Sequence, residues 1–304
     1  MSTQRSESQM RIGRRQIFAG VGLVVLLATV VRAGNPIRVA EELDVEYGYT
    51  GSTGVAGGGT AGGKIDEHAA DVKFVVSSQV TRNLLVRFGG EWQRFSFGVP
   101  AGLPVPATLQ QVSAVIGCDS QLGGQWIVRA ELQPGLYSDF AELTGGDVDA
   151  PFVLAGVYLA NPDLQWVAGL RIDGRSQYPV LPAAGVRWKF ADTWTLDFML
   201  PKPRLEYDLN DRSQLYVGAS LAAGTFRVGD RFGTDHGLAV LDHQTVDYLE
   251  VRVGAGWSWS ITPTLRLEAE AGSLVYRDFN FFNATIDFRS HGAPYGQVAC
   301  HARF

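Results

Sequence analysis

The 304-residue sequence is poor in the residues that build metal sites, disulfides and nucleic-acid interfaces. Its two cysteines, Cys118 and Cys300, form neither a CxxC pair nor a metal-ligand spacing, so we interpret them as unpaired thiols in different strands. There is no basic cluster, and acidic residues outnumber basic ones by 31 to 26. An acidic chain of this kind argues against nucleic acid as a partner.

Long apolar runs are also scarce, and the one present lies at the amino terminus. Residues 1–16 are polar and carry four arginines, residues 17–31 are almost wholly apolar, and residues 31–33 fit a signal peptidase site. A helix needs roughly 20 apolar residues to span a bilayer, so this run predicts a secretory signal over residues 1–33 that is cleaved after Ala33. Removing its five Arg and one Glu moves the net charge from −5 to −9.

The remaining residues, 34–304, contain no helical periodicity and alternate instead. From Leu249 to Ile261 the odd positions are apolar and the even ones are Glu, Arg, Gly or Ser, and the pattern resumes from Leu265 to Ala271. Alternation with a period of two predicts strands with one apolar and one polar face. Such runs exceed the five or six residues that are about usual in soluble proteins, which favours strands that cross a membrane.

The connections between these strands alternate between short and long. Polar turns lie at residues 82–83, 119–125, 161–163, 191–192, 210–212 and 262–264, and longer Gly- or Pro-rich connections lie at 50–67, 98–107, 138–149, 174–182, 229–244 and 281–289, with a compressed one at 201–203. Membrane barrels combine short turns at one end with long loops at the other. We therefore predict an all-β fold over residues 34–304, a transmembrane antiparallel up-and-down β-barrel of about fourteen strands. Twelve strands are the alternative, because those around 193–209 are short, and a secreted β-sandwich is the second compatible fold.

Aromatic residues occupy positions that a membrane barrel uses. Five of the seven tryptophans fall on apolar faces near strand ends: Trp126, Trp188, Trp194, Trp257 and Trp259. Amphipathic rings at both edges of the apolar band form the interfacial girdles of such barrels. The final residue, Phe304, follows apolar residues at every second position, and this end resembles the assembly signal of bacterial outer-membrane barrels. We expect location in the bacterial outer membrane, with its lipids and the barrel-assembly machinery as partners.

Three segments of the carboxy-terminal half carry a family resemblance. They are Leu200 to Leu205 (LPKPRL), Arg227 to Gly229 (RVG) and Tyr248 to Gly256 (YLEVRVGAG). These segments resemble a family of outer-membrane β-barrels that is classed only as a domain of unknown function. The resemblance implies the barrel fold and its location. It supplies no activity and no functional residues.

Several motifs suggest chemistry, and each also has a simpler interpretation. Gly58 to Lys64 reads GxxxxGK, but Ile65 replaces the Ser or Thr of a phosphate loop and no helix-forming run follows, so an external loop is favoured. The acidic residues of loop 138–149 could hold a hard cation, although solvated loop charges explain their irregular spacing. His236 and His243 share a loop with three aspartates, which is the best cluster for a metal or for acid–base work, yet no known ligand spacing is matched.

The polar faces supply the candidates for a functional lining. In a barrel they face the lumen, and the expected lumen-lining charges are Arg187, Lys189, Arg204, Glu206, Glu250, Arg252, Arg266, Glu268 and Glu270. We predict a non-enzymatic barrel without a cofactor, which passes or binds small solutes with selectivity set by these charges. A barrel with a closed lumen that serves as a structural or adhesive surface protein is the alternative, and a membrane-embedded hydrolase is a third possibility.

Overall fold

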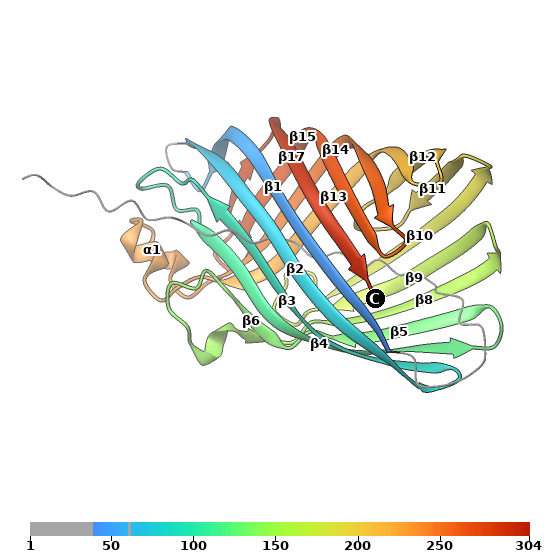
Figure 1. Cartoon of the computed structure of the whole chain (residues 1–304). Helices are drawn as coiled ribbons and strands as arrows, with labels where there is room; N and C mark the ends of the chain where they lie inside the picture. The colour runs from blue at the N-terminus through green and yellow to red at the C-terminus, as the bar shows by residue number, and fades with distance from the viewer. Residues whose placement is uncertain (1–38, 60–61) are drawn as a thin grey trace, which may run out of the picture.

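The computed structural model describes residues 39–59 and 62–304, and these form one β-barrel (Figure 1). The predicted signal segment, residues 1–33, lies outside the described residues. The first half of the barrel contains the strands β1 (Val39–Gly57), β2 (Gly63–Thr81), β3 (Leu84–Phe97), β4 (Thr108–Leu122), β5 (Trp126–Leu132), β6 (Gly135–Ser138), β7 (Val148–Asp149), β8 (Phe152–Asn161) and β9 (Leu164–Ile172). The second half contains β10 (Val180–Ala191), β11 (Trp194–Phe198), β12 (Arg204–Asn210), β13 (Ser213–Arg227), β14 (Thr245–Thr262), β15 (Leu265–Phe281), β16 (Ile286–Ser290) and β17 (Ala293–Arg303).

These segments combine into fourteen antiparallel strands that close on themselves. β5 and β6 form one interrupted strand, because both pair with β4. β7 and β8 form the next one, because they pair with β6 and β5 respectively. β16 and β17 form a third, because both pair with β15 and with β1. Closure follows because β1 pairs with both β2 and β17. The prediction of fourteen strands is confirmed, and the twelve-strand alternative and the sandwich are wrong.

The barrel has one end with short turns and one with long connections. All six predicted turns join strands at the end that we call the turn end, where the described chain also begins and finishes. At the opposite loop end lie the helix α1 (Phe232–Asp235) and the 3-10 helices η1 (Gly145–Asp147) and η2 (Ala239–Leu241). Figure 1 places α1 at the far left, opposite the turns of β8–β9 and β10–β11. Within the described residues, no helix is long and apolar enough to cross a membrane.

Two of the predicted long loops are largely strand. β1 continues to Gly57 and β2 begins at Gly63, within the connection expected at 50–67. β15 continues to Phe281 and β16 begins at Ile286, within the one expected at 281–289. In the first segment Gly, Ser and Thr obscure the alternation, and in the second the four-residue turn 282–285 separates two strand ends too short to be recognised in the sequence. Lys64 accordingly lies in β2 and not in the external loop that its GxxxxGK context suggested.

The outer face of the barrel is apolar and carries a tryptophan belt at one end. Large apolar side chains stay exposed on outward positions of the strands, for example Phe88 at 56% and Val298 at 56%. Six of the seven tryptophans are exposed close to the turn end: Trp126, Trp166, Trp188, Trp194, Trp257 and Trp259. The predicted five are all among them, but the belt occupies the turn end only, and not both edges of the apolar band as expected.

Candidate functional site

The polar faces of the strands point into the barrel, and their charges form a layer of ion pairs across it. Glu250 and Arg252 pair with each other and with two residues that the sequence did not single out, Glu67 and Arg277. Arg277 Nη2 lies 2.8 Å from Glu250 Oε2, and Arg252 Nη2 lies 3.2 Å from Glu67 Oε2. All four side chains are at most 8% exposed, so this cluster fills its part of the lumen.

A second cluster brings together three other predicted lumen residues. Arg204 Nη1 lies 3.0 Å from Glu268 Oε2, and Arg204 Nη2 lies 3.6 Å from Glu270 Oε2. The Arg204 guanidinium also stacks 3.9 Å from the centre of the Tyr216 ring, and the Tyr295 hydroxyl donates a hydrogen bond to Glu270. Glu268 and Glu270 point inward from β15, and Arg204 meets them from β12, on the other side of β13 and β14.

The remaining candidates lie nearer the turn end. Arg187 pairs with Asp197 and lies 3.1 Å from Glu206 through its Nη2 atom. Lys189 and Arg266 are exposed, and within the described residues neither forms an ion pair. These two cations therefore line an accessible mouth of the barrel, unlike the buried charges deeper inside.

A third buried cluster lies on β2 to β5 and was missing from the predicted set. Lys73 Nζ lies 2.8 Å from Glu91 Oε2 and 3.5 Å from Glu131 Oε1. Arg129 forms a two-pronged contact with Asp119, at 2.6 Å from each carboxylate oxygen. The signal was available in the sequence, because these residues occupy the polar positions of the same alternating strands. Burying charges is favourable only when each has a partner, which these five residues have, whereas neither carboxylate oxygen of the neighbouring Asp71 has a hydrogen-bond partner in the described structure.

Toward the loop end the interior becomes apolar and is filled. We call this set the apolar plug; its seventeen buried members are Val55, Ile65, Ala69, Phe95, Phe97, Leu103, Val105, Leu109, Tyr137, Phe226, Val228, Leu241, Val246, Tyr248, Phe279, Phe281 and Phe288. Leu103 and Val105 come from connection 98–107, and Leu241 comes from connection 228–244, so both connections fold inward. The plug obstructs a straight path along this side of the barrel.

At the loop end the last residues of β13 contact β6 and close the barrel around the plug, with Arg227 of β13 paired with Ser138 of β6. The Asp139 N–H donates to Arg227 O at 3.0 Å, and the Gly229 N–H donates to Asp139 Oδ2 at 2.9 Å. Arg227 Nη1 donates to Thr144 Oγ1 at 2.7 Å in the same connection. Burial raises the pKa of the Asp139 carboxyl, against the hydrogen bonds that it accepts.

The inner wall on the β9–β13 side is different, because part of it on β10 stays accessible, although inward side chains of the neighbouring strands, such as Thr195, Glu206 and Tyr216, are buried. The guanidinium of Arg187 on β10 points inward, where it pairs with Glu206. Alternate residues of a strand share a face, so Gly185 and Ala183 also lie on the inner face of β10. Ala183 is exposed and Gly185 is half-buried, whereas Lys73 and Glu91 on the opposite wall are 4% and 6% exposed. We call the β9–β13 side the open half of the barrel.

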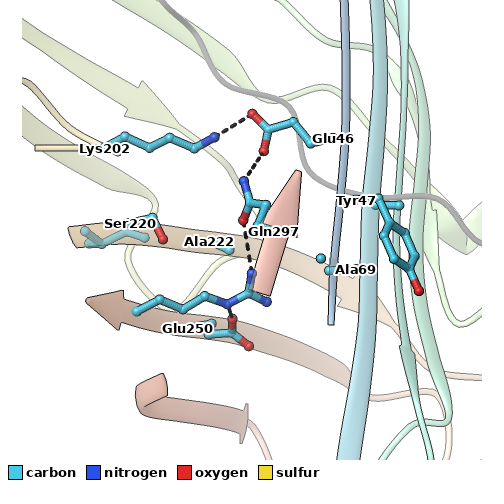
Figure 2. A pocket seen from close by; sticks show the side chains of 12 residues that line it. Glu46, Tyr47, Ala69, Lys202, Ser220, Ala222, Glu250 and Gln297 are labelled. Atoms are coloured by element: carbon cyan, nitrogen blue, oxygen red, sulfur yellow. Dashed lines mark hydrogen bonds and ion pairs between the residues drawn. The ribbon is translucent and has the colours of Figure 1, made fainter. Parts of the chain in front are cut away.

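A small pocket lies between the filled side and the open half (Figure 2). Lys202, from the compressed turn between β11 and β12, reaches across the lumen, and its Nζ lies 2.5 Å from Glu46 Oε1 on β1. Gln297 Nε2 donates to the other Glu46 oxygen at 2.9 Å, and Arg252 Nη1 donates to Gln297 Oε1 at 3.3 Å. We call the Lys202–Glu46 contact the lumen bridge. Ser220, Leu221 and Ala222 line the pocket on the β13 side.

The histidine loop holds its two histidines on different partners. His243 Nδ1 lies 2.6 Å from Asp230 Oδ1 and 3.2 Å from Arg227 Nη2, and His236 Nδ1 contacts the Phe232 carbonyl oxygen at 2.6 Å. None of these partners is a nucleophile of the serine or cysteine type. In the described part of the chain no group of three or more His, Cys, Asp or Glu residues could hold a metal ion, and the two cysteines are free.

Comparisons with known proteins concern the family and the fold. The model of a family described as Domain of unknown function (DUF6268) matches residues 73–292. Curated proteins include no match to the sequence. Among solved structures, an outer membrane channel from Pseudomonas putida F1 is 10% identical, with 90% of this chain and 100% of that chain covered and a TM-score of 0.46.

Two other solved barrels have similar values. The toluene transporter TodX of P. putida is 10% identical over 89% of this chain and 91% of that chain, with a TM-score of 0.38. The translocator domain of autotransporter NalP from Neisseria meningitidis is 12% identical over 89% of this chain and 90% of that chain, with a TM-score of 0.40. The three proteins differ in function, so their likeness assigns none to this chain.

Proposed function

This chain belongs to the DUF6268 family, a domain of unknown function, and we propose from its geometry that it is a passive channel for small solutes in the bacterial outer membrane. The observation that carries the proposal is the accessible stretch of inner wall on β10, on the β9–β13 side, opposite a wall that ion pairs and the apolar plug fill. A barrel with a purely structural role would have no need to keep one half of its interior accessible. The solute path then runs from the turn end along the open half.

Three features support the outer-membrane location. The outward side chains are apolar and six exposed tryptophans gather at the turn end, and both features suit contact with membrane lipids. The terminal residue completes the closure, since the Phe304 N–H donates to Glu41 O at 2.9 Å and the Glu41 N–H donates to Phe304 O at 3.1 Å. We propose that Phe304, 70% exposed beside β1, presents the signal to the barrel-assembly machinery.

The charges along the path would set its selectivity. Most of the predicted lumen residues are paired with opposite charges, so they contribute little net field to the lumen. Lys189 and Arg266 are exposed and lack ion pairs among the described residues, so they place two accessible cations on the inner wall at the turn end. Rings of unpaired cations favour anions in barrel pores. We therefore propose that these two residues favour entry of anionic over cationic solutes.

Permeability of intact cells tests the proposal. The barrel is produced in a host that lacks its own general porins, and entry of two probes is measured. Nitrocefin, a polar anion, is hydrolysed by a periplasmic β-lactamase, and N-phenyl-1-naphthylamine, an apolar dye, fluoresces once it reaches membrane hydrocarbon. Faster entry of at least one probe than in cells without the barrel is expected. If the assembled barrel accelerates neither probe, the channel proposal is wrong.

One observation favours the alternative of a closed structural barrel. The apolar plug seals the loop end on the filled side, and its aromatic members pack closely, with the Phe95 and Tyr248 ring centres 4.6 Å apart. If the protein is a closed barrel with a structural or adhesive role, cells that produce it should show no faster entry of either probe. The expectation that the protein is not an enzyme stays a prediction.

A further inference from the structure

The wall of the open half is interrupted above the hairpin of β11 and β12. These two strands have 5 and 7 residues, whereas β10 and β13 on either side have 12 and 15. The last pair between β10 and β11 is Val186 with Phe198, and the last pair between β12 and β13 is Arg204 with Gly218. Residues 180–185 of β10 therefore have no partner strand on this edge in the described chain.

The backbone groups at the interruption can be assigned from neighbouring hydrogen bonds. The Lys189 N–H donates to Asp163 O, on the β9 side, so the backbone groups of residues 180, 182 and 184 face the interruption. One of these is Pro182, which has no N–H to leave unpaired. Across the interruption, the Ala219 and Leu221 N–H groups donate to Pro203 O and Pro201 O, each at 2.9 Å.

The interruption is framed on all sides. β10 and β13 form its flanks, and the turn 199–203 forms its floor. Its upper border is the connection 173–179, which meets Asp247 at the start of β14: the Gln177 N–H lies 2.8 Å and Ser176 Oγ 3.0 Å from Asp247 Oδ2. Thr225 of β13 donates to the other oxygen of Asp247 at 2.7 Å. We call this framed interruption the window.

The window lies at the depth of membrane hydrocarbon. A tilted barrel strand climbs about 2.5 Å per residue along the membrane normal, so Leu181 stands about 18 Å above Trp188 of the tryptophan belt. The apolar band of such barrels is about 25 Å tall. Unpaired backbone groups at this depth occur only where they line a cavity or are covered by protein. The window therefore borders hydrocarbon on its outer side, and the pocket lined by Lys202 and Ala222 lies on the lumen side of its floor and of β13.

The rim is small and apolar, and it leads to the central pocket. Val180 and Leu181 are 56% and 54% exposed, and Ala183, Ala184 and Ala223 are exposed as well. On the inner side, Ser220 and Ala222 of β13 line the pocket beside the lumen bridge of Lys202 and Glu46. No charged side chain of this rim points into the hydrocarbon.

We propose that the window is a side opening through which small apolar solutes pass between the lumen and the hydrocarbon of the membrane. This inference rests on the proposed channel function. It specifies small apolar molecules as the solutes and the window as the place where they pass between the lumen and the membrane. An apolar solute suits the opening because its flanks on β10 and β13 carry small or apolar side chains, Lys202 of the floor is paired with Glu46 inside the lumen, and hydrocarbon lies outside. A second copy of the chain is a poorer occupant, because Pro182 cannot donate to an added strand.

Bulky substitutions at the rim test the inference. Ala183→Trp fills the inner side of the window and Ala223→Trp its outer side, and both positions are exposed, so the barrel can accommodate them. Ala269→Trp, at an exposed outward position of β15, is the matched control. In intact cells that produce each variant, we expect entry of N-phenyl-1-naphthylamine to fall to the level of cells without the barrel for the double rim variant. The Ala269→Trp control should keep the entry rate of the parent.

The outcomes separate this inference from the channel proposal. Entry of nitrocefin alone, or dye entry that the rim variants leave unchanged, overturns the side opening while the channel proposal stands. Entry of neither probe through the parent barrel overturns the channel proposal itself. Folding of each variant is checked by the faster migration of unheated barrel in detergent gels, and a single rim variant replaces the double one if the latter does not assemble.

Discussion

Lys202 and Glu46 meet inside the lumen although 156 residues separate them in the sequence. Lys202 extends from a turn that is compressed between two prolines, and Glu46 points inward from the first strand. Their side chains are 12% and 6% exposed, so the contact is largely shielded from solvent. It fixes the turn that forms both the floor of the window and one side of the pocket.

Removing the lumen bridge should widen the path. In Lys202→Ala the turn 199–203 loses its attachment to β1, while Glu46 keeps the hydrogen bond from Gln297. We expect faster nitrocefin entry into cells than with the parent barrel. Lys189→Ala removes the same charge at an exposed site and serves as the control, with entry equal to or below that of the parent. An assembled Lys202→Ala barrel with unchanged entry would show that the bridge does not limit passage.

The buried cluster on β2 to β5 predicts a large effect on stability. Lys73→Met leaves the Glu91 carboxylate without its cation at a site only 5% exposed, and Glu131, 1% exposed, keeps only the longer contact with Arg87 at 3.7 Å. Breaking a buried ion pair in this way costs about 3–5 kcal/mol. Urea unfolding in lipid vesicles should show this loss, whereas the exposed-site control Lys189→Met should stay within about 0.5 kcal/mol of the parent.

A double substitution checks the origin of that loss. If uncompensated charge is the cause, Lys73→Met combined with Glu91→Gln should recover part of the stability, because one buried carboxylate is then neutral. A double variant that is no more stable than Lys73→Met would instead assign the loss to packing.

The strands were predictable because alternation is local, but the partners of the lumen charges were not. Glu250 and Arg252 follow directly from the pattern Leu249 to Ile261. Their partner Arg277 lies 27 residues from Glu250, and Glu67 lies 210 residues from Arg277. Such contacts depend on the register with which the barrel closes, and register is a property of all strands together.

Sequence also missed features that depend on small residues. Gly and Ser carry little apolar signal, which concealed the upper ends of β1 and β2, although Val55 and Ile65 there are 2% and 0% exposed. The window has the same origin, since it arises from the shortness of β11 and β12 and from Pro182. The sequence showed short strands near 193–209, but it did not show that the wall stays open above them.

Leu241 anchors the connection 228–244 in the apolar plug, which predicts a difference between two neighbours. Leu241 is 0% exposed and Val240 is 54% exposed. Leu241→Ala should release the connection and accelerate trypsin cleavage at Arg231, because truncating a buried leucine costs about 2–5 kcal/mol. Val240→Ala should leave the cleavage rate unchanged. Equal rates in the two variants would contradict the inward packing of this connection.

The same connection should loosen in acid through Asp242. Its carboxylate accepts hydrogen bonds from the Thr234 N–H at 2.8 Å and from the Thr234 hydroxyl, and these lower its pKa in the folded state. A lowered pKa gives stability that is present above the ordinary aspartate pKa of about 3.9 and is lost as the pH falls through the folded value. Hydrogen exchange of residues 231–243, corrected for intrinsic rates, should therefore accelerate below about pH 4. Asp242→Asn should abolish this dependence and the exposed-site control Asp235→Asn should keep it; retention of the dependence in Asp242→Asn would assign it to another group.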